Sequence, residues 1–162
     1  MKHIKSIDPE VYHAIKNEIV RQEENIELIA SENFTTLAVF QAQGSVLTNK
    51  YAEGYLRHRY YGGNEFVDKL EDLTKKRALK LFGLSEKKWN VNVQPYSGSP
   101  ANLAIYLALV PLHEKIMGMK LDMGGHLTHG HGVSATGKIW KQVPYGVNKK
   151  TEMLDYAELM KI

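Results

Sequence analysis

Apolar residues recur every three to four positions in two long segments of the chain, and this spacing predicts a helix in each. The first segment covers residues 8–24, where Asp8 and Pro9 are a typical N-cap and first helical residue. The second covers residues 65–82 and ends at Gly83, a residue type that often terminates helices. Charged residues occupy the remaining faces, so both helices are expected to have a solvated side.

The second half of the chain alternates between short apolar runs and helical segments. Strand, turn, helix and strand in this order are typical of a βαβ unit, so an α/β fold is expected. A parallel sheet normally has more strands than the three visible here, which predicts the opening of a larger, truncated domain. The other predicted elements are a helix over 36–48, strands over 91–94, 115–119 and within 140–147, a buried apolar helix over 101–110 and a helix beginning at 155.

Composition narrows the class of protein without identifying it. The 162 residues are 43% hydrophobic and 24% charged, which is typical of a soluble globular domain. The net charge is only +3, and basic residues alternate with acidic ones, so no nucleic-acid surface is predicted. Without cysteine, the chain has no disulfide, zinc–thiolate site or cysteine nucleophile. No apolar run has the length of a signal peptide or membrane helix, so we expect a cytoplasmic protein that binds no membrane.

Residues 97–100 (SGSP) carry the first pattern with a chemical meaning. Ser99 is a suitable N-cap and Pro100 a suitable first helical residue, so the positive end of the helix dipole would face a ligand there. Gly98 lets the backbone approach closely and Ser97 adds a second hydroxyl, which favours phosphate binding. An ordinary capped helix is the alternative, because the spacing matches neither a dinucleotide fingerprint nor a P-loop.

Three histidines follow the predicted strand over 115–119, at positions 126, 129 and 131. A metal site is one interpretation, but the histidines lie on a glycine-rich loop without cysteine, so no metal is predicted. A polar loop with incidental histidines is a second interpretation. An imidazole stacked on a flat ring is a third, if residues 97–99 hold the phosphate of an aromatic cofactor.

Residues 50–64 contain more tyrosine and glycine than an ordinary connecting segment. Glu53 lies close to two of these tyrosines, and partial burial there would tune it as an acid or a base. The tyrosine hydroxyls could donate hydrogen bonds to a phosphate or a carboxylate. A tyrosine-rich packing or interface loop is the alternative.

Five motifs of the chain together resemble the serine hydroxymethyltransferase family, in the family's order and at similar spacing. Any one motif is weak, whereas five long ones in order are specific, and the similarity runs through nearly the whole chain. The motifs are LIASEN at 28–33, GSVLTNKYAEGY at 44–55, RYYGGNE at 59–65, NVQPYSGSPAN at 92–102 and GGHLTHG at 124–130.

The resemblance implies the start of the large domain of a type I pyridoxal-phosphate fold, like that of aspartate aminotransferase. Residues 1–64 would hold the N-terminal helix and a dimer and active-site segment, and residues 65–162 the first part of the pyridoxal-phosphate-binding α/β domain. The family interconverts serine plus tetrahydrofolate and glycine plus methylene-tetrahydrofolate, in one-carbon metabolism and amino-acid biosynthesis. It works as a homodimer or a pair of dimers.

The resemblance also implies roles for single residues. Glu53 would be the catalytic acid/base beside the substrate hydroxyl, and His126 the catalytic histidine that stacks on the pyridine ring. The implied cofactor-binding residues are Tyr51 (toward the neighbouring subunit), Ser97, Gly98, Ser99 and His126; the substrate-binding ones are Ser31, Glu53 and Tyr61; the folate-binding ones are Glu53, Tyr60, Leu121, Gly125 and Leu127. The cofactor would act as an electron sink, while the protein orients the bond to be broken and manages protons.

The chain departs from the family's pattern in three places. Leu56, Arg57 and His58 stand where the family commonly has Pro-Gly-Lys, so a differently built turn is expected. Tyr96 stands where many members have histidine. The family's Schiff-base lysine lies further along than Ile162, so pyridoxal phosphate is expected to bind non-covalently at most, and the chain alone to be inactive.

Three interpretations follow. The leading one is an N-terminal fragment or truncated gene product of a serine hydroxymethyltransferase. A non-catalytic paralogue that binds a full-length subunit is the second, and a metal hydrolase built on the three histidines is the third. Because the 101–110 helix is apolar nearly all round, we also expect self-association or a bound partner, with residues 50–64 at or near the interface.

Overall fold

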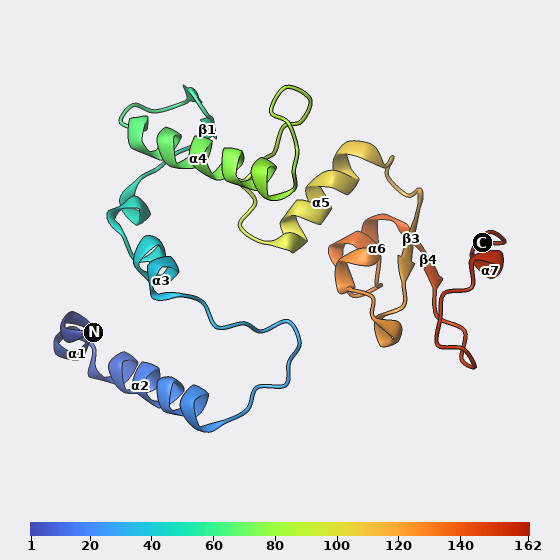
Figure 1. Ribbon diagram of the computed structural model, residues 1–162, viewed down its shortest axis with the longest axis horizontal. Helices are drawn as coiled ribbons and strands as arrows, with labels where there is room; N and C mark the ends of the chain where they lie inside the picture. Colours follow the sequence, from blue (N-terminus) through green and yellow to red (C-terminus); the bar gives the residue numbers. More distant parts are fainter. The chain divides into compact units, whose positions relative to one another are not determined.

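The computed structural model describes residues 1–162, which form two units, Met1–Val67 and Asp68–Ile162. The first unit is helical with one short hairpin, and the second contains a pair of parallel strands (Figure 1). This mixture of helix and sheet agrees with the predicted α/β class. The two units meet in sequence at Val67, whereas the prediction divided the chain after residue 64, and the roles assigned to the two parts stay predictions.

Helix α2 (Pro9–Glu24) begins as the sequence predicts. Pro9 occupies the first turn, and the Asp8 carboxylate accepts a hydrogen bond from the amide of Val11 at 3.0 Å. A helix that was not predicted, α1 (Lys2–Ile7), precedes α2 and packs against it. Its six residues are too few to show a helical period, so the hydrophobic pattern could not reveal it.

The helix predicted over residues 36–48 is shorter than expected. Helix α3 (Leu37–Gln43) ends at Gly44, and a separate 3-10 turn, η1 (Val46–Asn49), follows. The Ser45 hydroxyl accepts from the amide of Leu47, so this serine begins a new turn in place of continuing the old one.

Strands β1 (Gly54–Tyr55) and β2 (His58–Arg59) form an antiparallel hairpin with Leu56 and Arg57 in the turn. Arg57 has a φ of 62°, in the left-handed region that costs a residue with a side chain roughly 1–2 kcal/mol. A Pro-Gly pair would favour a positive φ at the same position. The turn of this chain therefore carries backbone strain at Arg57 that a glycine at that position would avoid.

Helix α4 (Glu65–Leu81) matches its prediction closely, with the positive φ of Gly83 just beyond its end. Lys76 and Asp72 form an ion pair of 2.6 Å along its surface. The strand predicted over 91–94 is wrong, because this segment pairs with no other strand. The Asn92 side chain accepts from the amide of Gln94 at 2.9 Å, a local bond that competes with strand pairing.

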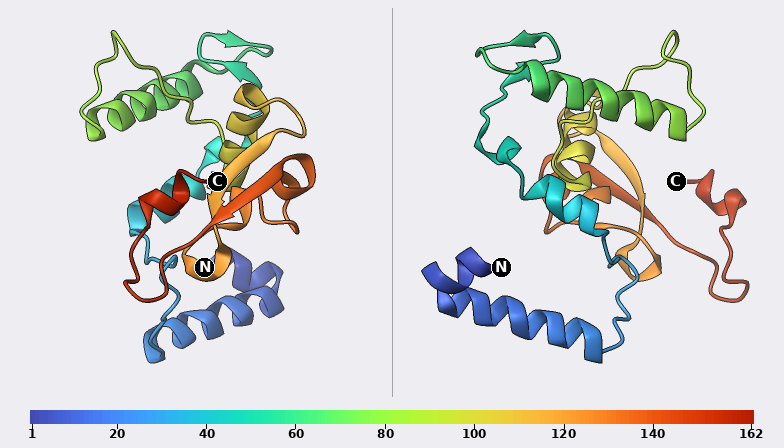
Figure 2. Two further views of the ribbon diagram at one scale, coloured as in Figure 1. Left: turned by 90° about the vertical axis from the view of Figure 1, so that its right-hand side faces the viewer. Right: turned by 60° about the vertical axis from the view of Figure 1, so that its left-hand side comes forward.

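The only parallel pair joins β3 (Lys115–Met119) to β4 (Lys141–Tyr145), with Lys115 opposite Lys141. Both strands were predicted, and the two further views show them side by side (Figure 2). The connection between them contains η2 (Leu121–Met123), η3 (Leu127–His129) and α6 (Ala135–Ile139). The βαβ unit is therefore β3, α6 and β4, and the predicted strand over 91–94 and helix over 101–110 are not part of it.

Helix α5 (Gly98–Leu109) was predicted to be buried, and none of its residues is. The hydrophobic core of the chain consists of Leu79, Ile116 and Trp140, whose indole donates to the carbonyl of Pro111 at 3.0 Å. The last helix, α7 (Tyr156–Leu159), begins where predicted, with the carboxylate of residue 155 as its cap. None of the helices combines the length and the apolar character needed to cross a bilayer.

Candidate functional site

Glu53 and Tyr61 form a polar pair in the first unit. The Tyr61 hydroxyl donates to Glu53 Oε2 at 3.0 Å. The hairpin brings the two together, since the amide of Tyr60 donates to the Glu53 carbonyl at 3.1 Å across it. The hydrogen bond to the Glu53 carboxylate, followed by its negative charge, raises the pKa of Tyr61. The phenol therefore stays protonated and keeps donating to Glu53, whose side chain is exposed and not partly buried as the sequence suggested.

Aromatic rings beside this pair stay accessible to a ligand or another chain. The ring of Tyr51 meets that of Tyr61 edge-on, with 5.5 Å between their centroids. Tyr60 is 77% exposed. The structure thus brings together three of the predicted residues, Glu53, Tyr51 and Tyr61, with Tyr60 next to them in sequence.

Two side chains that received no role from the sequence hold this segment in shape. Arg59 donates from Nη1 to the carbonyls of Ala52 and Gly54, each at 2.8 Å. Asn64 is buried and donates to the carbonyl of Tyr61 at 2.8 Å. Both bind backbone atoms, so their function is to fix the path of the chain that presents Glu53.

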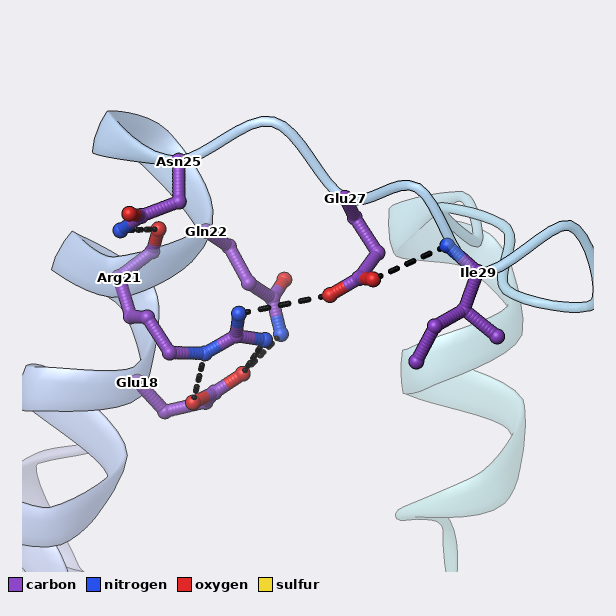
Figure 3. A network of polar contacts seen from close by, with 6 residues as sticks. All are labelled: Glu18, Arg21, Gln22, Asn25, Glu27 and Ile29. Atoms are coloured by element: carbon purple, nitrogen blue, oxygen red, sulfur yellow. Dashed lines mark hydrogen bonds and ion pairs between the residues drawn. The ribbon is translucent and has the colours of Figure 1, made fainter.

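Ser31, the predicted carboxylate ligand, lies exposed in a short turn and makes no hydrogen bond to Glu53 or Tyr61. A polar network leads from α2 to this turn (Figure 3). Arg21 pairs with Glu18 at 2.8 Å and with Glu27 at 3.5 Å, and Glu27 accepts from the amide of residue 29 at 3.1 Å. Hydrogen bonds from Arg21 and then from the side-chain amide of Gln22 lower the pKa of Glu18 to about 2.

The predicted phosphate-binding residues lie at the N-terminus of α5, but the helix begins earlier than expected. Ser97, not Ser99, occupies the N-cap position, and no side chain caps this end. Ser97, Gly98 and Ser99 are all exposed. A Cβ atom added at Gly98 would meet nothing within 4 Å. The start of α5 is therefore exposed and has no side-chain cap, and the free backbone amides of a helix N-terminus suit an anion.

His126 lies on the loop after β3, and hydrogen bonds within that loop orient its ring. Its Nδ1 accepts from the amide of Thr128 at 3.1 Å and lies 2.8 Å from the Thr128 hydroxyl. Asn102, one turn after Ser99 in α5, donates from Nδ2 to the same hydroxyl at 2.9 Å. This bond joins the helix that carries the predicted phosphate ligands to the loop that carries His126. The sequence motifs include Asn102 and Thr128, but periodicity gave no signal for their contact.

Three of the predicted folate-binding residues, Leu121, Gly125 and Leu127, share this loop at the carboxyl end of β3, where α/β sheets commonly bind ligands. Leu121 and Leu127 are exposed. Gly125 differs, because a Cβ atom there would lie 2.0 Å from the Met119 carbonyl oxygen. The close approach of the loop to β3 therefore requires glycine at this position.

The three histidines do not converge on one point. The Nδ1 atoms of His126 and His129 accept backbone amides within the loop, and their ring centroids are 5.8 Å apart. No three histidine, aspartate or glutamate side chains come together as a set that could hold a metal ion.

Together, the fold and these sites define an α/β protein. Its predicted site residues in the second unit lie at the N-terminus of α5 and on the loop that follows strand β3. Comparison with known proteins identifies the family. A family model of serine hydroxymethyltransferase matches residues 4–162. The chain belongs to the serine hydroxymethyltransferase family.

Curated relatives agree with this assignment. A serine hydroxymethyltransferase of Methanosarcina barkeri is 56% identical over 161 residues, which cover 99% of this chain and 38% of the relative. Serine hydroxymethyltransferases of Caenorhabditis elegans and Caenorhabditis briggsae are each 54% identical over 162 residues, covering 97% of this chain and 32% of the relative. The chain thus spans about a third of the length of the relatives it matches.

Proposed function

We propose that this chain supplies part of the active site of a serine hydroxymethyltransferase, which interconverts serine plus tetrahydrofolate and glycine plus methylene-tetrahydrofolate. One observation carries the proposal: the Asn102–Thr128 hydrogen bond ties the uncapped start of α5 to the loop of His126. In this proposal residues 65–162 begin the large domain of a type I pyridoxal-phosphate fold. Residues 1–64 supply the acid/base group and a dimer segment.

Pyridoxal phosphate fits the residues of the second unit. Its phosphate is an anion, and Gly98 and Ser99 are exposed at the uncapped, positive end of α5. Ser97, Gly98 and Ser99 would hold that phosphate, His126 would stack on the pyridine ring, and Tyr51 would reach the phosphate in a neighbouring subunit. When bound, the cofactor supplies an electron sink for bond cleavage at the substrate Cα.

The first unit provides the groups that handle protons and the amino acid. Glu53 would accept the proton of the serine hydroxyl, since Oε1 is left open while Tyr61 binds Oε2. Ser31 would bind the substrate carboxylate, at the turn that the Arg21 network supports. The proposed folate-binding residues are Glu53, Tyr60, Leu121, Gly125 and Leu127.

Replacement of Gly98 with alanine is expected to weaken cofactor binding at least tenfold, about 1.4 kcal/mol. The added methyl group would occupy the space in which the phosphate is proposed to lie, without meeting other protein atoms. Pyridoxine 5′-phosphate is the suitable probe, because it lacks the aldehyde that reacts with surface lysines. Its dissociation constant can be measured by phosphorus NMR titration of the chain.

Gly132→Ala is the matched control, because that glycine is exposed and also has nothing within 4 Å of an added Cβ atom. It should bind the probe as the unchanged chain does. Equal affinity of the Gly98 and Gly132 variants would contradict the proposed phosphate site, as would failure of the unchanged chain to bind the probe.

We also propose that the chain associates, as a homodimer or a larger assembly, with residues 50–64 at or near the interface. Only three hydrophobic side chains are buried, while Tyr51, Tyr55 and Tyr60 are each at least 65% exposed. Exposed apolar surface on this scale is typical of an interaction site. Light scattering at micromolar concentration should give at least twice the mass of one chain, and Tyr55→Glu should lower it.

Tyr96→Glu serves as the control for that measurement, since Tyr96 is 90% exposed and lies outside residues 50–64. The substitution should leave the mass unchanged. A monomeric chain with one cooperative thermal transition would refute association.

A further inference from the structure

We infer that Asn102 and Thr128 are positioning residues that hold the His126 ring in one orientation and in one tautomer, with its proton on Nε2. The inference rests on the proposed function, because it explains how the ring would be kept ready for a flat cofactor. It concerns the two residues behind the histidine, which touch neither substrate nor cofactor in the proposal.

The direction of each hydrogen bond follows from the chemistry of the partners. Asn102 Nδ2 can only donate, so the Thr128 oxygen accepts from it at 2.9 Å. The hydroxyl proton of Thr128 is then available for the other atom within reach, Nδ1 of His126 at 2.8 Å. The amide of Thr128 donates to the same nitrogen at 3.1 Å. A ring nitrogen that faces two donors carries no proton in the neutral imidazole, so the proton lies on Nε2.

Burial makes this arrangement durable. Thr128 is 8% exposed, so water competes poorly for its hydroxyl and amide. Loss of one partner would leave a buried polar atom unpaired, which costs roughly 1–3 kcal/mol. The hydrogen bonds therefore restrain the ring more strongly than they would on an open surface.

A second restraint acts on the backbone of His126. The amide of His126 donates to Nδ1 of His129 at 3.2 Å, while the His126 side chain caps the turn by accepting from Thr128. This reciprocal pair fixes both the backbone and the ring of His126 at the start of η3. Only the Nε2 edge and the faces of the ring remain for a ligand.

The hydrogen bond from Asn102 relates the His126 restraint to the proposed phosphate site, because Asn102 and that site both lie on α5. Asn102 follows Ser99 by three positions, so the two lie on neighbouring parts of the same helix surface. A cofactor held at the start of α5 and stacked on His126, as proposed, would then meet an imidazole whose orientation is set from that same helix. If the Asn102–Thr128 bond served only to join the loop to the helix, the tautomer of His126 would not depend on it. If the bond positions the ring, the tautomer should change when the bond is removed, and this can be measured.

Nitrogen NMR of the chain labelled in its histidines tests the inference directly. At about pH 8.5, well above the usual histidine pKa of about 6.5, the rings are neutral and the two tautomers give distinct nitrogen shifts. The unchanged chain should show His126 only as the Nε2–H form. Thr128→Val keeps the shape but removes the hydroxyl, while the backbone amide of residue 128 still donates to Nδ1. It should therefore move the His126 shifts part of the way toward the exchange-averaged shifts of exposed His3.

Two further variants keep the test decisive if Thr128→Val folds poorly. Thr128→Ser retains the hydroxyl and should restore the single tautomer. Asn102→Ala removes the donor that orients the hydroxyl and should give a partial change, with His131 unaffected as an internal control. A proton on Nδ1 in the unchanged chain, or identical His126 shifts in all these variants, would overturn the inference.

Titration of the same proteins with pyridoxine 5′-phosphate separates this inference from the proposed function. A change of tautomer in the variants, with no binding to the unchanged chain, would support the positioning role and refute the cofactor site. Binding to the unchanged chain, with His126 shifts that do not respond to Thr128→Val or Asn102→Ala, would leave the cofactor site and refute the positioning role. If both hold, Thr128→Val should weaken binding severalfold and Thr128→Ser should restore it.

Discussion

Replacement of Glu53 with glutamine is expected to lower folate-dependent turnover of serine by about 10²- to 10⁴-fold, the usual contribution of a general acid or base. Glutamine keeps the size of the side chain and can still accept from Tyr61, so the hairpin should survive. It cannot take a proton from the serine hydroxyl. Cofactor binding should persist, since the proposed phosphate ligands lie at the start of α5.

The measurement requires the remaining part of the enzyme. The chain can be co-expressed with the complementary C-terminal part of the Methanosarcina barkeri relative, which is 56% identical over the shared region. Glu152→Gln, an exposed change in the other unit, is the control and should retain full turnover. Tyr61→Phe should cost less than Glu53→Gln, because it removes only the hydrogen bond that orients the carboxylate. Equal loss of turnover and of cofactor binding in Glu53→Gln would show that Glu53 is structural.

Replacement of Gly125 with alanine is expected to reduce the free energy of unfolding by about 3 kcal/mol, the upper end of the usual cost of overpacking. The added Cβ would lie 2.0 Å from the Met119 carbonyl oxygen, and it would also press on the carbonyl of Lys120. Both neighbours are backbone atoms, so the loop must move away from β3. Gly132→Ala should change the free energy by less than about 0.5 kcal/mol, as exposed substitutions usually do.

Urea unfolding followed by tryptophan fluorescence reports on the right part of the chain, because Trp89 and Trp140 both belong to the second unit. Trp140 is almost fully buried, so its emission should change on unfolding. Equal midpoints for the two alanine variants would contradict the close packing of the loop.

Periodicity and end signals in the sequence located the longer elements well. α2 and α4 carry both a clear apolar stripe and a recognisable end, and β3 and β4 lie where short apolar runs predicted strands. Errors arose where local polar bonds decided the outcome. Asn92 draws the backbone away from strand pairing, and Ser45 begins a new turn where a helix was expected to continue.

For the candidate site, motifs gave the residues but not the contacts between them. Glu53 and Tyr61 are eight positions apart, and only the hairpin brings one onto the other. Asn102 and Thr128 are 26 positions apart, and no pattern along the chain predicts which polar side chain of α5 meets the loop. Long-range polar contacts depend on how elements dock, which hydrophobic periodicity does not encode.

The crossover between β3 and β4 has a consequence for how such a protein can evolve. In a parallel pair, the connection must run from the carboxyl end of the first strand back to the end of the sheet at which that strand began. The candidate ligand loop lies inside this connection. The entropy of closing a loop grows only with the logarithm of its length, so doubling the length costs about 0.6 kcal/mol. Insertions around exposed Gly132 would therefore burden folding little, while the strand register stays fixed. Natural selection can lengthen or remodel this connection to suit a new ligand without rebuilding the sheet beneath it.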